Sequence, residues 1–143
     1  HGNQDRQLRE NCRRVDGAIT GLLADLKQRG LLDETLVVWA SEFGRTPMLQ
    51  GNESPEKCGR DHHKEAFTIW MAGGGVKGGM SYGSTDDMGY WIGENPVQFR
   101  DLHATLFHLL GMDHRKAVYR YQGLDQRLTG VEDDARVLSS ILT

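Results

Sequence analysis

Residues 35–40 read Thr-Leu-Val-Val-Trp-Ala, and this stretch decides the fold. It predicts a β-strand that is apolar on both faces, which is typical of a central strand covered by a layer on each side. Residues 5–29, directly before it, predict one long helix whose apolar residues recur at steps of three and four. These residues are Leu8, Cys12, Val15, Ile19, Leu22 and Leu26. A helix that leads into such a strand is half of a β-α-β unit, and the strand before the helix is not among these residues.

A second apolar strand is predicted at Ala66–Ala72, after a polar loop that spans residues 41–65. A helix over Gln98–Leu110 follows, and Gly111 is a suitable residue to end it. The glycine-rich run Gly73–Gly79 is not a Walker loop, because no Gly-Lys-Ser or Gly-Lys-Thr follows at the required spacing.

Two doubly apolar strands beside two amphipathic helices predict an α/β fold built as a three-layer sandwich. Leu36–Ala40 and Ala66–Met71 are expected as neighbouring central strands, with both helices packed on the sheet. A short hairpin is expected where Val118–Tyr121 and Gln126–Leu128 pair. The whole of residues 1–143 is expected to belong to a single α/β domain.

The composition excludes two classes of partner. Lys and Arg number 17 against 20 Asp and Glu, so there is no basic excess to indicate nucleic-acid binding. No apolar run approaches the roughly 18 residues that a membrane span needs. The two cysteines do not make a disulfide framework. Cys12 is expected in the core, on the apolar face of the helix, and Cys58 in the polar loop.

The segment Ser41–Pro47 (Ser-Glu-Phe-Gly-Arg-Thr-Pro) comes directly after the first strand. Ligands of open α/β sheets bind just beyond the carboxyl ends of strands, so Glu42 and Arg45 lie where a site is expected. The two strands pair either in parallel, through a long crossover, or more simply as an antiparallel pair. The antiparallel arrangement brings His62 and its neighbours Asp61 and His63 close to Glu42.

Imidazole and carboxylate groups together suit zinc, manganese or iron. A solvated polar loop is an equally good interpretation of these residues from composition alone. Only one of the adjacent His62 and His63 is expected to face the site, because neighbouring side chains diverge in extended chain. Arg45, Arg60 and Lys77 are candidates for holding a sulfate or phosphate group, with ordinary surface cations as the alternative.

Five stretches resemble the domain of unknown function 1501 family, a group of sulfatase-like bacterial proteins of the alkaline phosphatase superfamily. They are His1–Gln4, Ser41–Pro47, Gly59–His62, Ala72–Gly79 and Asp101–Leu106. The resemblance covers nearly the whole chain, but only the C-terminal portion of the family. It implies a sandwich of the alkaline phosphatase and sulfatase type, and a metal-dependent hydrolase of small-molecule or polymer-linked phosphate or sulfate esters. It also implies an exported protein, periplasmic or secreted, whose N-terminal portion, absent here, carries the nucleophile.

The resemblance further implies that His1, Glu42 and His62 hold divalent metal, with zinc or manganese ahead of calcium. His1 and His62 match two ligands of one metal position. Glu42 and Phe43 align with the Asp-His pair of a second position. Phe43 has no lone pair to donate, so the chain departs from the superfamily pattern there. We expect Glu42 and His62 to converge near His1, and Phe43 to point away into apolar packing.

Two other functions are compatible with these residues. One is a non-catalytic secreted or envelope domain that keeps the fold and has lost a full metal set, which the Phe43 departure favours. The other is a copper site made by the free amino group and imidazole of His1. No catalytic residue is identified within this chain.

Overall fold

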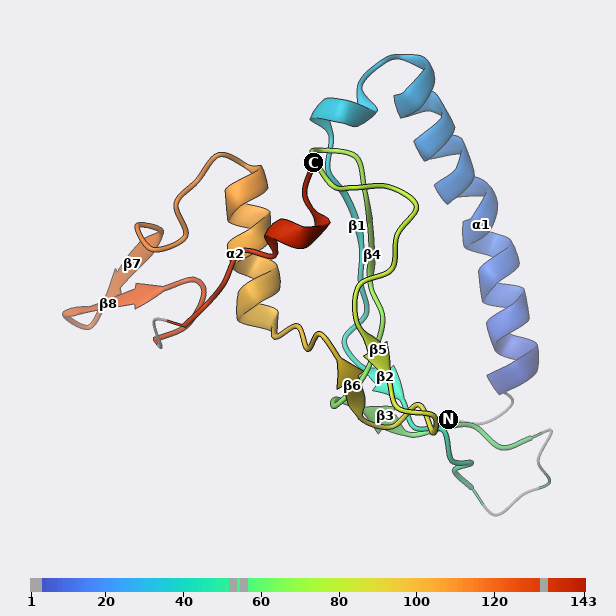
Figure 1. The fold of residues 1–143 in the computed structure, drawn as a ribbon. Helices are drawn as coiled ribbons and strands as arrows, with labels where there is room; N and C mark the ends of the chain where they lie inside the picture. The colour runs from blue at the N-terminus through green and yellow to red at the C-terminus, as the bar shows by residue number, and fades with distance from the viewer. Residues whose placement is uncertain (1–3, 52–53, 55–56, 132–133) are drawn as a thin grey trace.

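A computed structural model describes residues 4–51, 54, 57–131 and 134–143 (Figure 1). Its elements, in chain order, are α1 (Gln4–Gln28), η1 (Leu32–Glu34), β1 (Val37–Trp39), β2 (Gly44–Arg45), β3 (His62–His63), β4 (Trp70–Ala72), β5 (Ser84–Thr85), β6 (Ile92–Glu94), α2 (Phe99–Leu109), β7 (Val118–Tyr121), β8 (Leu124–Arg127) and η2 (Ser139–Ile141). Both helices begin and end within one residue of the predicted limits. Both long strands are shorter than predicted.

The strands β1 and β4 pair in the antiparallel sense, with Val37 opposite Ala72 and Trp39 opposite Trp70. The two tryptophan rings stack across the pair, with centroids 6.2 Å apart and planes at 4°. The antiparallel arrangement of these neighbours is therefore confirmed. It follows that the end of β1 and the start of β4 lie at one end of the pair.

The expected burial of this sheet is not found. Among the described residues β1 and β4 form a two-stranded sheet, so neither is a central strand. Val38 and Trp39 are 39% and 45% exposed, and because successive strand residues point to opposite faces, neither face of β1 is fully covered by the described residues. The three-layer sandwich stays a prediction.

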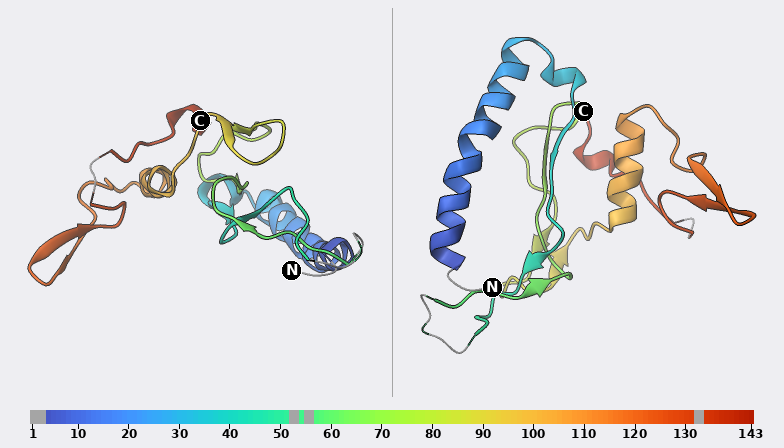
Figure 2. Two further views of the ribbon diagram at one scale, coloured as in Figure 1. Left: turned by 90° about the horizontal axis from the view of Figure 1, so that it is seen from below. Right: turned by 180° about the vertical axis from the view of Figure 1, so that it is seen from behind.

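The long helix α1 runs antiparallel to β1 but does not pack on the sheet, which corrects the expectation (Figures 1 and 2). Most of its apolar stripe is open to solvent, with Leu8 52% and Leu22 50% exposed, whereas Ile19 and Leu26 are half-buried. Cys12 on this stripe is also exposed, so its expected place in the core is wrong. Cys58 is the buried cysteine instead, because the polar loop folds around it.

The described residues form three further hairpins: β2–β3, β5–β6 and β7–β8. The β7–β8 hairpin confirms the predicted pairing and projects away from the rest of the chain (Figure 1). Its turn uses Gln122 and Gly123, both at positive φ (49° and 82°), as a tight two-residue turn requires. The β5–β6 hairpin was not predicted, because its strands are short and fully exposed and so carry no apolar alternation.

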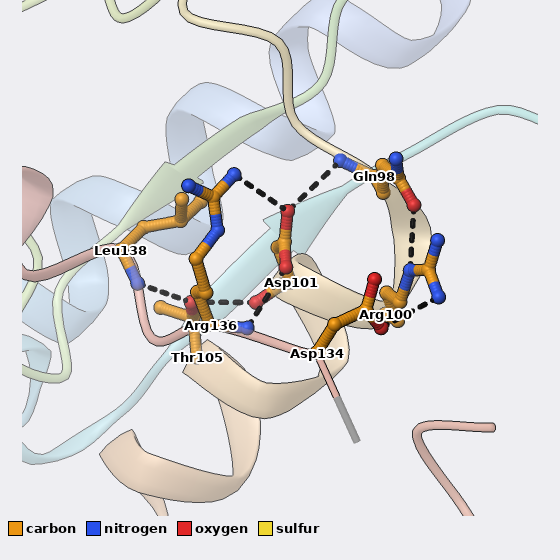
Figure 3. Close-up of polar contacts among 7 residues, drawn as sticks. All are labelled: Gln98, Arg100, Asp101, Thr105, Asp134, Arg136 and Leu138. Atoms are coloured by element: carbon orange, nitrogen blue, oxygen red, sulfur yellow. Dashed lines mark hydrogen bonds and ion pairs between the residues drawn. The ribbon is translucent and has the colours of Figure 1, made fainter. Parts of the chain in front are cut away.

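The buried core gathers around α2 and the C-terminal segment. Ala104 and Thr105 on α2 are fully buried, and Leu138 and Ile141 pack against the same region. The Thr105 hydroxyl donates to the carbonyl of Asp101 (2.7 Å) and accepts from the N–H of Leu138 (2.9 Å). A polar side chain thus fixes the C-terminal segment at the centre of the core (Figure 3).

The carboxylate of Asp101 reinforces this attachment (Figure 3). It is 3% exposed and accepts the N–H of Arg136 at 2.8 Å and the N–H of Gln98, the N-cap of α2, at 3.4 Å. At the rim, the exposed Asp134 accepts from the Arg100 guanidinium at 2.7 Å. Asp101 therefore accepts hydrogen bonds both from the N-terminus of α2 and from the C-terminal segment.

The glycine-rich turn after β4 is held from two sides. A Cβ on Gly73, which has φ of 72°, would lie 2.2 Å from the Leu32 carbonyl oxygen, so only glycine fits there. On the other side, the N–H of Lys77 donates to the Ile141 carbonyl at 2.9 Å, and the N–H of Thr143 donates to the Gly75 carbonyl at 3.0 Å. Among the described residues, no helix is both long enough and apolar enough to cross a bilayer.

Candidate functional site

Glu42 and His62 meet just beyond the carboxyl end of β1. The Nδ1 atom of His62 lies 2.7 Å from Oε1 of Glu42. An ionised carboxylate only accepts, so the ring nitrogen is the donor of this contact. The two side chains are 38% and 63% exposed, so the pair lies at the surface rather than in a sealed pocket. The predicted convergence of these two residues is confirmed.

The β2–β3 hairpin holds the pair in place. Gly44 lies opposite His63 and Arg45 opposite His62, and the N–H of Thr46 donates to the Asp61 carbonyl at 3.0 Å. A Cβ on Gly44 would lie 2.2 Å from the Ala66 carbonyl oxygen. The hairpin closes this tightly because residue 44 is a glycine.

Asp61 contributes a further carboxylate at this end. Its Oδ1 atom accepts the backbone N–H of His62 at 2.7 Å. This contact fixes the chain just before the imidazole and places a second negative group beside it. Asp61 was expected only as a neighbour of His62, since a single acidic residue before two histidines is not a distinctive pattern.

His63 faces the opposite way and does not join Glu42. It is 5% exposed, and its Nε2–H donates to the carbonyl of Tyr90 at 2.6 Å. The two rings also pack, with centroids 4.2 Å apart. Adjacent residues of a strand point to opposite faces, so only one of the two histidines can reach Glu42. His63 instead holds the turn between β5 and β6 through its contacts with Tyr90.

The orientation expected for Phe43 is wrong. Its ring lies edge-on to the His62 ring, with centroids 5.9 Å apart and planes at 79°, and the side chain is exposed. The described residues offer no apolar pocket for it here, so it packs against the nearest ring. Phe43 thus forms one wall of the site.

The three candidate cations separate into two groups. Arg45 and Arg60 lie together, since Nη1 of Arg45 donates to the Arg60 carbonyl at 3.1 Å. Lys77 lies elsewhere, and its Nζ donates to the Ser140 carbonyl at 3.1 Å. Residues after β4 lie beyond the amino end of β1, whereas Glu42 lies beyond its carboxyl end. Lys77 therefore does not belong to the site.

His1 lies outside the described residues. The start of α1 is nevertheless placed, because the N–H of Gln4 donates to the carbonyl of Cys58 at 3.4 Å. The helix therefore begins next to the loop that carries Arg60 and His62, at the end of the molecule where β2 and β3 lie (Figure 1). Within the described ranges, no group of three or more His, Cys, Asp or Glu side chains could hold a metal ion.

The donor types at this site fit part of a metal centre. A carboxylate oxygen and an imidazole nitrogen are ligands that zinc and manganese accept. At 2.7 Å the two atoms share a hydrogen bond, and a common ion at about 2.0–2.2 Å from each would replace it. Two such groups are fewer than the three or four protein ligands of a zinc site.

Two cavities lie away from the pair. One, of about 500 Å³, is at the end of α2 and is lined by residues that include His108 and Arg115. Another, of about 450 Å³, lies along β4 and the following loop and has Trp70 and Tyr82 in its lining. Neither lining includes Glu42 or His62.

Comparison with protein families gives a match over residues 1–142 to the family described as "Protein of unknown function (DUF1501)". The chain belongs to this family. No curated protein and no solved structure matches this chain. Membership of the DUF1501 family accounts for the order in which the family's motifs occur along this chain. The description of the family assigns no activity to it.

Proposed function

We propose that this DUF1501 chain forms part of a metal-dependent phosphate- or sulfate-ester hydrolase, of the sulfatase-like kind that the motifs resemble. The observation that carries the proposal is the 2.7 Å contact between His62 and Glu42 at the carboxyl end of β1. Ligand sites of α/β sheets occur at this position. Zinc or manganese is the proposed ion, with calcium as a third choice. The protein is also proposed to be exported.

In this proposal Glu42 and His62 are metal ligands and His1 is a third. A bound divalent ion polarises the ester oxygen and stabilises the charge that develops on it. Arg45 and Arg60 carry positive charge on the same hairpin and bind the anionic group of the substrate. The nucleophile and further ligands are proposed to lie outside residues 1–143.

The test is metal affinity, measured by calorimetry with Zn²⁺ and with Mn²⁺ on the 143-residue chain. We expect weak binding, and a further loss of about tenfold or more in Glu42→Ala and in His62→Ala. Glu10→Ala is the matched control, because Glu10 is an exposed carboxylate paired with Arg14 on α1. Equal affinity in all four proteins would reject the metal site.

A second candidate is a non-catalytic domain that retains the fold. Phe43 favours it, because its ring, which cannot ligate, packs against His62 where the resembled pattern has a ligand. Turnover of an aryl phosphate and an aryl sulfate separates the two functions. We expect none from the 143-residue chain, since no nucleophile is identified in it. Turnover by the natural polypeptide that contains these residues supports the hydrolase, and its loss in Glu42→Ala ties the activity to this site.

A further inference from the structure

Most of the apolar stripe of α1 is left uncovered by the described residues, and only Ile19 and Leu26 on it are half-buried. Leu8, Val15 and Leu22 are all exposed, and Cys12 between them is exposed too. Polar residues occupy the other faces of the helix, so the stripe is a side made for burial. Helices in proteins draw most of their stability from packing such a side, not from intrinsic propensity.

The sheet beside α1 is open in the same way. β4 occupies one edge of β1, and within the described part of the chain no strand pairs with the other edge. Val38 and Trp39 of β1 are exposed as well. An open edge with apolar faces is a template on which another strand adds.

The amount of surface indicates what kind of occupant is needed. The chain exposes 10606 Å², about 3,200 Å² more than the roughly 7,400 Å² expected for a compact protein of this mass. Even large obligate dimers bury only about 1,000–2,500 Å² on each subunit. The excess is above what most dimers bury on one subunit, which favours a further part of the same domain as the occupant.

We propose that a further segment of the same polypeptide, outside residues 1–143, adds at least one apolar β-strand parallel to β1 at its free edge. α1 then packs over that strand and β1 through its stripe. Helix α1 runs antiparallel to β1, as the helix of a right-handed β-α-β unit does between two parallel strands (Figure 1). The proposal extends the proposed function, which also places groups of the site outside these residues. Its test involves neither metal nor turnover.

The thiol of Cys12 reports on the stripe directly. In the 143-residue chain we expect an aromatic disulfide reagent to modify Cys12 rapidly and the buried Cys58 slowly, so that Cys58 is an internal control. In the natural polypeptide that contains these residues, we expect Cys12 to be protected at least as well as Cys58. Rapid modification of Cys12 in that polypeptide, or a natural polypeptide with no residues beyond these, would overturn the proposal.

A matched pair of variants gives a second readout. Leu22→Asp places a charge on the stripe, and Ala24→Asp places the same charge nearby on an exposed position of another face. In the natural polypeptide we expect Leu22→Asp to lower the thermal midpoint by several degrees more than Ala24→Asp. In the 143-residue chain we expect the two to be alike. Equal effects in the natural polypeptide contradict the proposal, as does a dimer of the 143-residue chain, seen by sedimentation, in which Cys12 is protected.

Discussion

The His62 imidazole lies 2.7 Å from the Glu42 carboxylate. His62 is the first residue of β3, and Glu42 lies just beyond the end of β1. The contact exists because β1 and β4 pair in the antiparallel sense and the β2–β3 hairpin folds back between them. The side chains are polar, partly exposed and held by main-chain pairing. Such an arrangement is available for binding without large rearrangement.

Loss of this contact is expected to change stability little. Glu42→Ala or His62→Ala removes a pair whose members are 63% and 38% exposed, and exposed pairs contribute about 0–1 kcal/mol. Urea unfolding of the metal-free protein is the measurement. A loss of several kcal/mol would mean that the pair is structural and would weaken its assignment as a binding site.

Gly44→Ala is expected to be destabilising. Its Cβ would lie 2.2 Å from the Ala66 carbonyl oxygen and 2.8 Å from the Phe67 Cβ, so the backbone of the hairpin has to shift. A cost of about 1–3 kcal/mol is expected from unfolding curves. Gly17→Ala is the control, because Gly17 lies in α1 with open space around its Cβ position, and alanine is favoured there by about 0.5–1 kcal/mol.

Asp101→Ala is expected to cost about 1–3 kcal/mol, because the N–H groups of Gln98 and Arg136 lose an acceptor that is itself almost fully buried. Asp134→Ala breaks an exposed contact with Arg100 on the same face and is expected to cost about 1 kcal/mol or less. Unfolding by urea measures both. Equal losses in the two variants would contradict the central place given to Asp101.

His63→Leu is expected to loosen the β5–β6 hairpin. The substitution leaves the Tyr90 carbonyl without the ring N–H that it accepts at 2.6 Å, at a cost of about 1–3 kcal/mol. Faster hydrogen exchange is expected across Ser84–Glu94. His108→Leu, at an exposed ring on α2, is the control and is expected to leave that exchange unchanged.

The Asp113 carboxyl is expected to titrate at unusually low pH. The backbone N–H of Arg115 donates to it at 3.0 Å and holds its pKa below the ordinary value, and the positive charge of Lys116 acts in the same direction. A lowered pKa in the folded state means that this stabilisation is present above the unfolded pKa, and is lost as pH falls through the folded one. A carboxyl NMR titration checks this. A midpoint at or above about 3.9 would contradict it.

Local sequence patterns predicted the elements well. The stripe over residues 5–29 located α1, and the leucines of Gln98–Leu110 located α2. The antiparallel option, favoured for simplicity, placed His62 next to Glu42, because pairing of two strands fixes where their ends lie. The helices depend on residues that are close in sequence, and the contact of His62 with Glu42 depends on how β1 and β4 pair.

Burial was predicted poorly, because it depends on what surrounds an element. Cys12 is exposed and not in the core as expected, since the described residues leave most of the helix stripe uncovered, whereas Cys58 is buried within the polar loop where it was expected. The direction of Phe43 and the distance of Lys77 from the site depended on packing that no local pattern encodes. The site's third expected ligand, His1, lies outside the described residues.

The core around α2 has a thermodynamic consequence. Its largest fully buried side chain is Thr105, a hydrogen-bonded hydroxyl residue, and many large apolar side chains are already in water. Heat capacity rises on unfolding in proportion to newly wetted apolar surface. The 143-residue chain should therefore unfold with a heat-capacity change below the usual 12–15 cal/mol/K per residue, roughly, and with a shallow dependence on denaturant. Its melting would be broad, and its stability curve would be nearly flat on cooling.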